Sequence, residues 1–166
     1  MNSSRPWKWA LGAQLASLIY FETCVLVPLG AWNDQPGGNA PFSKDNIVLG
    51  AIVGGVQLLI LAGTYWRFKP LLWFGLAAYS LWLILHFQGL WVPYIFGASP
   101  GYATMYARVF GRTTKLLPNF GNHLAPDAMH IFIDVFAAAV LVTMVNYMRS
   151  QRRSQASAPA ASSNES

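Results

Sequence analysis

Four long runs of apolar residues dominate the chain, at about 9–29, 47–65, 71–87 and 126–148. Each is close to the ~20 residues that an α-helix needs to cross a bilayer. Turn-forming or basic residues separate the runs, and few polar residues interrupt them. The pattern predicts an all-α fold, a four-helix transmembrane bundle that forms one membrane domain over residues 1–153.

The connection between the third and fourth runs is much longer than the usual loop of about 4–6 residues. Within it, apolar side chains recur at helical spacing over residues 102–117, after a Ser-Pro helix-start signal. We therefore expect an amphipathic helix at about 100–117 that lies in the membrane interface. Its polar side would carry three cations: Arg108, Arg112 and Lys115.

Composition supports the membrane assignment, because 54% of the residues are hydrophobic and only 10% are charged, against about 25% charged in a soluble domain. The net charge of +5 does not indicate nucleic-acid binding, because most cations flank apolar runs at one predicted side of the membrane. Those cations are Arg5, Lys8, Arg67, Lys69, Arg149, Arg152 and Arg153. We expect cytoplasmic N- and C-termini, contact with membrane lipid, no nucleic-acid partner, and a disordered Ser/Ala/Pro-rich tail at 154–166.

Acids and histidines enter the predicted spans at similar heights, in the outward half of the bilayer. They are Glu22 in the first span, His86 at the end of the third, and His130 and Asp134 in the fourth. Ionisable groups at such depth are costly and usually have a function or a specific partner. These four residues are therefore the candidate catalytic groups.

The start of the fourth span carries the densest polar pattern. Pro126 is well placed as the first helical residue, and Asp127 as an acid in the first turn. At 100° per residue, Asp127, His130 and Asp134 lie within about a 60° arc, so their side chains share one face. That face should point into the protein.

The leading hypothesis is an integral membrane enzyme that performs acid/base chemistry on a small hydrophobic substrate, as an isomerase, cyclase or hydrolase. In this hypothesis Glu22 and Asp134 supply protons, His130 is the base, oriented by Asp134 or Asp127, and His86 orients substrate or base. No cofactor is required. The expected substrate-binding residues are Tyr79, Trp82, Arg108, Arg112 and Asp127.

Other readings of the same residues stay open. His86 and His130 with Asp134 or Glu22 would suit zinc or iron. Glu22 alone could carry protons in a proton-coupled small-molecule transporter. The chain could also be a non-catalytic subunit or assembly factor of a membrane complex, in which the polar groups hydrogen-bond across helices. The Gly50-x-x-x-Gly54 spacing would allow close helix approach, including approach in a homo-oligomer.

Overall fold

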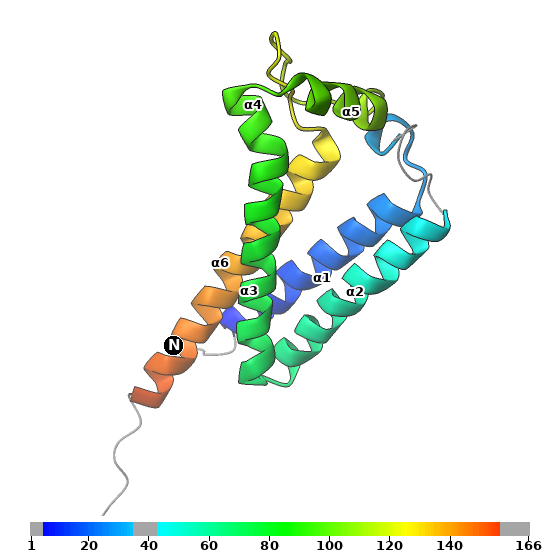
Figure 1. The fold of residues 1–166 in the computed structure, drawn as a ribbon. Coiled ribbons are helices and arrows are strands. Elements are labelled where there is room, and N and C mark those ends of the chain that lie inside the picture. Colours follow the sequence, from blue (N-terminus) through cyan, green and yellow to red (C-terminus); the bar gives the residue numbers. More distant parts are fainter. Residues whose placement is uncertain (1–4, 35–42, 157–166) are drawn as a thin grey trace, which may run out of the picture.

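Four helices long and apolar enough to cross a membrane make up most of the structure (Figure 1). The computed structural model describes residues 5–34 and 43–156, and this part of the chain is helical apart from turns and two isolated bridges. The spans are α1 (Arg5–Leu26), α2 (Lys44–Tyr65), a third that begins as α3 (Lys69–His86), and α6 (Ala128–Ala156). The predicted all-α class and the four apolar helices are confirmed.

The long helices contact one another in the order α1, α2, α3, α6 and back to α1. Their buried core, which includes Ile60, Leu72, Val140 and Met144, lies toward the end that carries the α2–α3 connection. Gly75 permits this packing, since a Cβ there would approach the Ile60 side chain to 2.6 Å. Figure 1 shows that α1 and α2 diverge from α3 toward the opposite end. The divergence leaves room between the helices at that end.

The third span is longer than predicted, because the helix does not end at residue 87. It continues through the π-helical turn η2 (Phe87–Trp91) and α4 (Val92–Phe96). Pro93 has no N–H to bond the carbonyl of Gly89 four residues earlier, and that carbonyl instead accepts a hydrogen bond from the Tyr102 hydroxyl. The π-helical turn and this tertiary bond allow the helix to pass the proline.

The predicted helix over 100–117 is shorter in the structure, where α5 spans Pro100–Phe110. Ser99 caps its start by accepting a bond from the Tyr102 N–H at 3.3 Å. After Phe110 the chain turns toward the loop that follows α1, and the Thr114 N–H donates to the Ala31 carbonyl at 2.7 Å. The periodic apolar pattern continues beyond the helix, but Leu116 is exposed.

Helix α6 begins at Ala128 rather than at Pro126. Asp127 occupies the capping position, since its Oδ1 accepts from the His130 N–H at 3.0 Å. The helix also extends to Ala156, so the first residues of the predicted tail at 154–166 are helical; residues 157–166 lie outside the described part.

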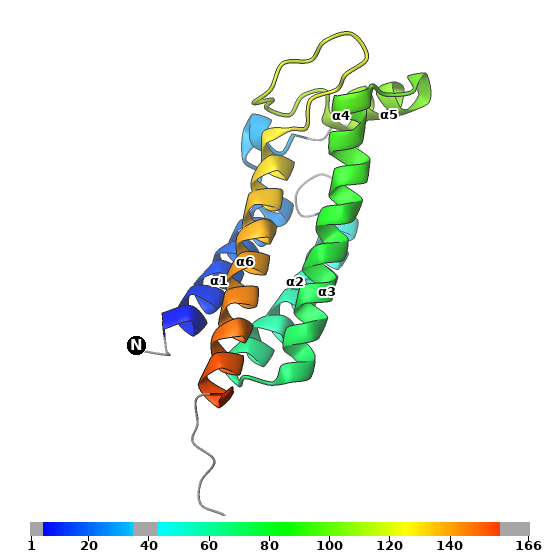
Figure 2. The same cartoon turned by 90° about the vertical axis from the view of Figure 1, so that its left-hand side faces the viewer.

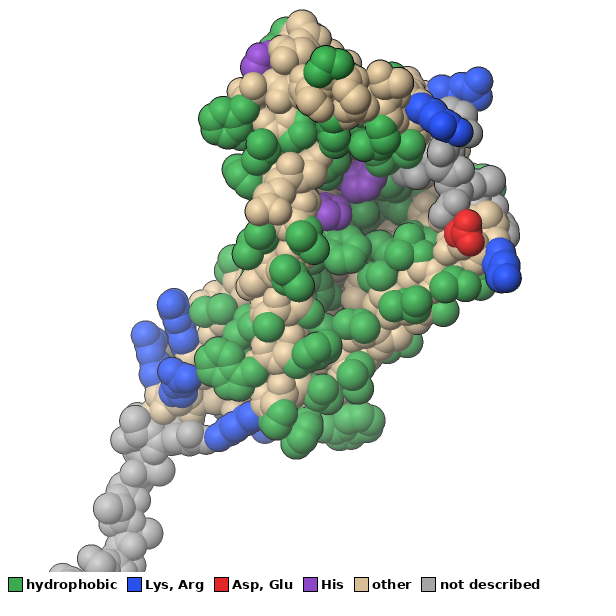
Figure 3. All heavy atoms as spheres, viewed as in Figure 1, with side chains coloured by type: hydrophobic (Ala, Val, Ile, Leu, Met, Phe, Trp, Pro, Cys, Tyr) green, Lys and Arg blue, Asp and Glu red, His purple; other side chains and the backbone are tan. Residues whose placement is uncertain are grey.

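The start of α1, the end of α6 and the α2–α3 connection lie at one end of the molecule, and α4 and α5 lie at the other (Figures 1 and 2). Lys and Arg side chains gather around the first end, on the face seen in Figure 3. The arrangement agrees with an even number of spans. The cytoplasmic location of the termini stays a prediction.

Candidate functional site

A cavity of about 160 Å³, called here the histidine cavity, lies where the long helices diverge. Figure 3 shows histidine side chains inside a hollow on this face of the molecule, below the segment that contains α4 and α5. The lining residues come from all four long helices and from the loop after α1. They are Phe21, Cys24, Val25, Asn33, Asn46, Leu49, Trp82, His86, Met129, His130 and Ile133.

His86 at the end of α3 is held by Asp134 of α6. Its Nδ1 lies 2.7 Å from Asp134 Oδ1, and the indole N–H of Trp91 donates to Asp134 Oδ2 at 2.9 Å. The π-helical turn explains why residues 86 and 91 reach the same carboxylate, because a π-helix closes i to i+5 and brings these positions to one side. The His86 ring also packs on Trp82, with the ring centroids 4.9 Å apart.

His130 is held by Asp127, the residue that caps α6. Its Nδ1 lies 2.7 Å from Asp127 Oδ2, while Asp127 Oδ1 accepts the His130 backbone N–H. Asp127 is fully buried. Because both of its oxygens bind His130, this carboxylate positions the imidazole and is not exposed to the cavity.

The two acid–imidazole pairs face one another across a short distance. The ring centroids of His86 and His130 are 5.5 Å apart, and the ring planes are inclined by 54°. A carboxylate accepts hydrogen bonds, so each Nδ1 carries a proton, and the Nε2 of a neutral ring keeps a lone pair. The site therefore offers two oriented imidazoles, each able to accept a proton at Nε2 and to stabilise the resulting cation through its carboxylate.

A half-buried cation supports the Asp127 side of the site. Lys115 folds back, and its Nζ donates to the Tyr106 hydroxyl at 2.8 Å, the Thr113 hydroxyl at 2.8 Å and the Phe110 carbonyl at 3.0 Å. Because Lys115 binds these acceptors around the end of α5, it does not lie with Arg108 and Arg112 on the polar side of a helix, as the sequence predicted. Burial lowers the pKa of Lys115, and the attraction of Asp127 opposes this shift.

The pKa of Asp127 is held below its usual value. Burial alone would raise it, but the hydrogen bonds and charge of His130, together with the charge of Lys115, outweigh burial. Burial raises the pKa of the neighbouring Tyr106 hydroxyl, which donates to the Ala125 carbonyl. Asp127 is thus an ionised anchor for His130.

Glu22 does not line the histidine cavity. Its carboxylate packs against two glycines of α2, so that a Cβ on Gly54 would collide with Glu22 Oε1 and one on Gly50 would lie 2.9 Å from Oε2. Glu22 Oε1 is buried and has no hydrogen-bond partner among the described residues. The Gly50-x-x-x-Gly54 notch is therefore filled by a side chain of the same chain. The catalytic and transport roles of Glu22 stay predictions.

The predicted substrate-binding residues lie in three different places. Trp82 lines the histidine cavity, and Tyr79 lies one turn away on α3, lining a separate apolar chamber. Arg108 is exposed on α5. Arg112 is also exposed, at 70%, and its guanidinium lies 4.0 Å from the Asp34 carboxylate. The structure therefore brings together the histidines and Trp82, and leaves both arginines on the outer surface.

The described residues contain no cluster of three or more His, Cys, Asp or Glu side chains arranged to hold a metal ion. Asp134 contacts the Nδ1 of His86. It is therefore placed to orient a metal-binding His86 through a hydrogen bond, and not to bind the metal itself. The two Nε2 atoms are the groups that could bind a metal from the protein side.

Sequence reasoning missed two residues that complete the site, Trp91 and Lys115. The sequence pattern gives Trp91 no role, and only the π-helical turn brings its N–H to Asp134. Lys115 appeared at helical spacing with two arginines, and only the end of α5 at Phe110 lets its side chain turn back. Neither contact has a signal in the local sequence.

Comparison of the chain with protein-family models, with curated proteins and with solved structures gave no significant match. The functional argument therefore depends on the geometry and chemistry of the site.

Proposed function

We propose that the chain is an integral membrane enzyme, a four-helix transmembrane bundle that performs acid/base chemistry on a small hydrophobic substrate. The observation that carries this proposal is the pair of carboxylate-bound imidazoles, 5.5 Å apart, on the wall of one cavity. Two oriented bases on one cavity suit the removal of a proton from one atom and its return to another. Isomerisation is therefore the preferred reaction, with cyclisation or hydrolysis as related outcomes of the same groups.

The proton balance needs no oxidant or reductant. His130 Nε2 removes a proton from the substrate, breaking one bond to hydrogen, and Asp127 stabilises the imidazolium that forms. His86, entering the cycle protonated, donates from Nε2 to another atom of the substrate and forms the new bond to hydrogen. Asp134 and Trp91 position His86 and do not touch the substrate. Proton transfer between the two rings, directly or through water, restores the starting state.

Membranes that contain the protein can test this function before the substrate is known. We would incubate them in D₂O with a lipid extract and follow deuterium entering C–H bonds by mass spectrometry. Wild-type protein should label one component that His130→Ala and His86→Ala leave unlabelled. His123→Ala is a matched control, because His123 binds the Tyr94 carbonyl and does not line the cavity. Identical labelling by wild type and the His86/His130 double variant would contradict the proposal.

A metal-dependent form of the reaction is the second candidate, and one observation favours it. Histidines that bind metals usually donate their other ring N–H to a carboxylate or carbonyl, as His86 and His130 do here. Zinc or iron at the two Nε2 atoms would need water or substrate as further ligands. Metal analysis of purified wild type decides between the forms. About one ion per chain that disappears in His86→Ala would assign the metal form, and labelling activity in metal-free protein would assign the acid/base form.

A further inference from the structure

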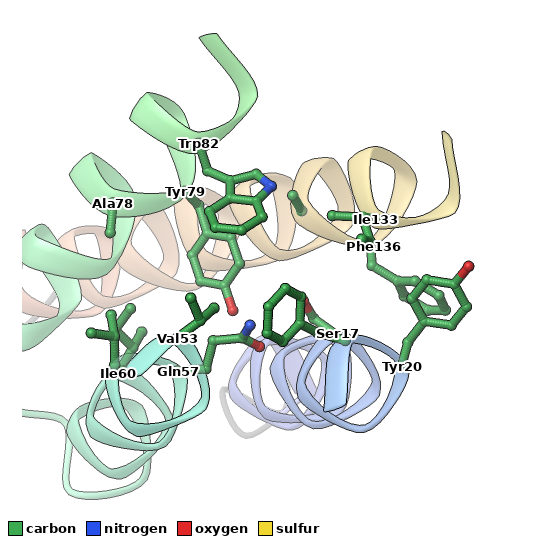
Figure 4. A pocket seen from close by; sticks show the side chains of 13 residues that line it. Ser17, Tyr20, Val53, Gln57, Ile60, Ala78, Tyr79, Trp82, Ile133 and Phe136 are labelled. Atoms are coloured by element: carbon green, nitrogen blue, oxygen red, sulfur yellow. The ribbon is translucent and has the colours of Figure 1, made fainter. Parts of the chain in front are cut away.

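A second space lies beside the histidine cavity, toward the end where the long helices converge. This chamber has a volume of about 60 Å³, and its mostly apolar walls come from α1, α2, α3 and α6 (Figure 4). It shares the side chains of Phe21, Trp82 and Ile133 with the histidine cavity. One molecule could therefore contact both spaces.

Three buried polar atoms on the chamber wall have no partner at normal hydrogen-bond distance among the described residues: Gln57 Oε1, the Tyr79 hydroxyl and the Trp82 indole N–H. Ser17, which also lines the chamber, is a longer-range partner of the Tyr79 hydroxyl. The side chains of Gln57 and Tyr79 come from the neighbouring helices α2 and α3 and are nine-tenths buried, at 9% and 7% exposed. Figure 4 shows the Tyr79 hydroxyl directed toward the region of the Gln57 amide. Buried polar groups are nearly always satisfied, so three such atoms at one chamber indicate a missing polar group.

We propose that the chamber binds the hydroxyl group of a neutral, lipid-soluble alcohol or phenol. The lining residues are all uncharged, which favours a neutral ligand. A hydroxyl both donates and accepts, so it can donate to the Gln57 amide oxygen and accept from the Tyr79 hydroxyl. A ketone or ether only accepts and would leave the Gln57 oxygen without a donor.

The position of the chamber also sets the length of this ligand. Tyr79 and His86 are seven residues apart on α3, which is about 10 Å along the helix at 1.5 Å per residue. A molecule anchored by its hydroxyl at Gln57 and Tyr79 would thus place an atom about 10 Å away beside the histidines. The hollow in Figure 3 opens on the side of the long helices, so the ligand would enter from the bilayer. Binding of this ligand in the chamber does not depend on the proposed function. That the ligand is also the substrate of the enzyme rests on the proposed function.

Calorimetry in detergent micelles can test the site with 4-butylphenol, which has the required length, and with butylbenzene as the matched probe that lacks the hydroxyl. Wild-type protein should bind 4-butylphenol saturably and more tightly than butylbenzene. Loss of one hydrogen bond in Tyr79→Phe or Gln57→Met should weaken 4-butylphenol binding about two- to tenfold and leave butylbenzene unchanged. Tyr147→Phe is the control, because Tyr147 is a buried tyrosine of α6 that does not line the chamber.

Equal affinity of wild type for both probes would overturn the inference. So would unchanged 4-butylphenol binding in both folded chamber variants, because the polar atoms would then be satisfied by water. The His86→Ala/His130→Ala double variant separates this inference from the proposed function. If that variant still binds 4-butylphenol and gives the same deuterium labelling as wild type, the proposed enzymatic function is refuted and the binding site is supported. Labelling that depends on the histidines, without selective 4-butylphenol binding in wild type, would refute the binding site alone.

Discussion

The substitution Asp127→Asn should change the tautomer of His130 without removing the cap of α6. In the structure Asp127 Oδ1 accepts the His130 backbone N–H, and Oδ2, 2.7 Å from the ring, accepts the Nδ1 proton. Asparagine is as good a capping residue as aspartate, and its amide oxygen will keep the backbone bond. Its NH₂ group must then face Nδ1. Because NH₂ only donates, Nδ1 becomes an acceptor and the proton moves to Nε2.

The size of the effect follows from the bond that is lost. A hydrogen bond to a charged group contributes about 1.5–3 kcal/mol, which corresponds to a factor of roughly 10 to 150 in the tautomer ratio. Neutral His130 should therefore be more than about nine-tenths in the Nδ1–H form in wild type. The same carboxylate-to-amide change in a Ser–His–Asp triad lowers kcat about 10⁴-fold, and a loss of 10² to 10⁴ is expected here.

Nitrogen-15 NMR of histidine-labelled protein at pH 9 measures this directly, since the chain has only three histidines. All three rings have Nδ1 beside an acceptor, so all three should be Nδ1–H in wild type. Asp127→Asn should convert only His130, and Asp134→Asn should convert only His86, with His123 as the internal reference. A His130 ring that stays Nδ1–H in Asp127→Asn, or that is Nε2–H in wild type, would refute the orienting role of Asp127.

Three further predictions concern stability in detergent micelles. Because the pKa of Asp127 is lowered in the folded protein, its carboxylate should contribute fully to the free energy of unfolding above the pKa of a free aspartate, and this contribution should be lost as the pH falls through the folded-state pKa. Acid unfolding that is equally steep in Asp127→Asn would contradict this. Gly54→Ala should cost about 1–3 kcal/mol in the free energy of unfolding by displacing Glu22, whereas Gly55→Ala, which meets open space, should be neutral or stabilising; equal stability of the two would place Glu22 elsewhere. Tyr102→Phe should cost about 1–3 kcal/mol and speed amide exchange around the π-helical turn, because one carbonyl loses its donor, and unchanged exchange would show that the bond is not needed.

Much of the architecture could be predicted from local pattern. The four apolar runs predicted the helices that could span a membrane, because length and hydrophobicity are properties of each segment by itself. Helical geometry also predicted that Asp127, His130 and Asp134 share one face. The ends of the third span and of α5 could not be predicted, because they depend on tertiary hydrogen bonds. The Tyr102 hydroxyl donates to the Gly89 carbonyl, and the Lys115 ammonium donates to the Phe110 carbonyl.

The pairing of acids with histidines was decided only by the tertiary structure. Sequence reasoning left Asp127 and Asp134 as alternative partners of His130, because both lie on its face of the helix. The packing of α3 against α6 brings His86 to Asp134, and the start of α6 at Ala128 leaves Asp127 free to cap the helix and hold His130. Depth in the bilayer also suggested Glu22 as a member of the site, but the direction in which α1 faces α2 turns its carboxylate into the glycine notch. Sequence by itself predicted which residues would lie at a similar height along the helices, because height follows from position within each apolar run. Helix rotation and packing determined which of these residues meet.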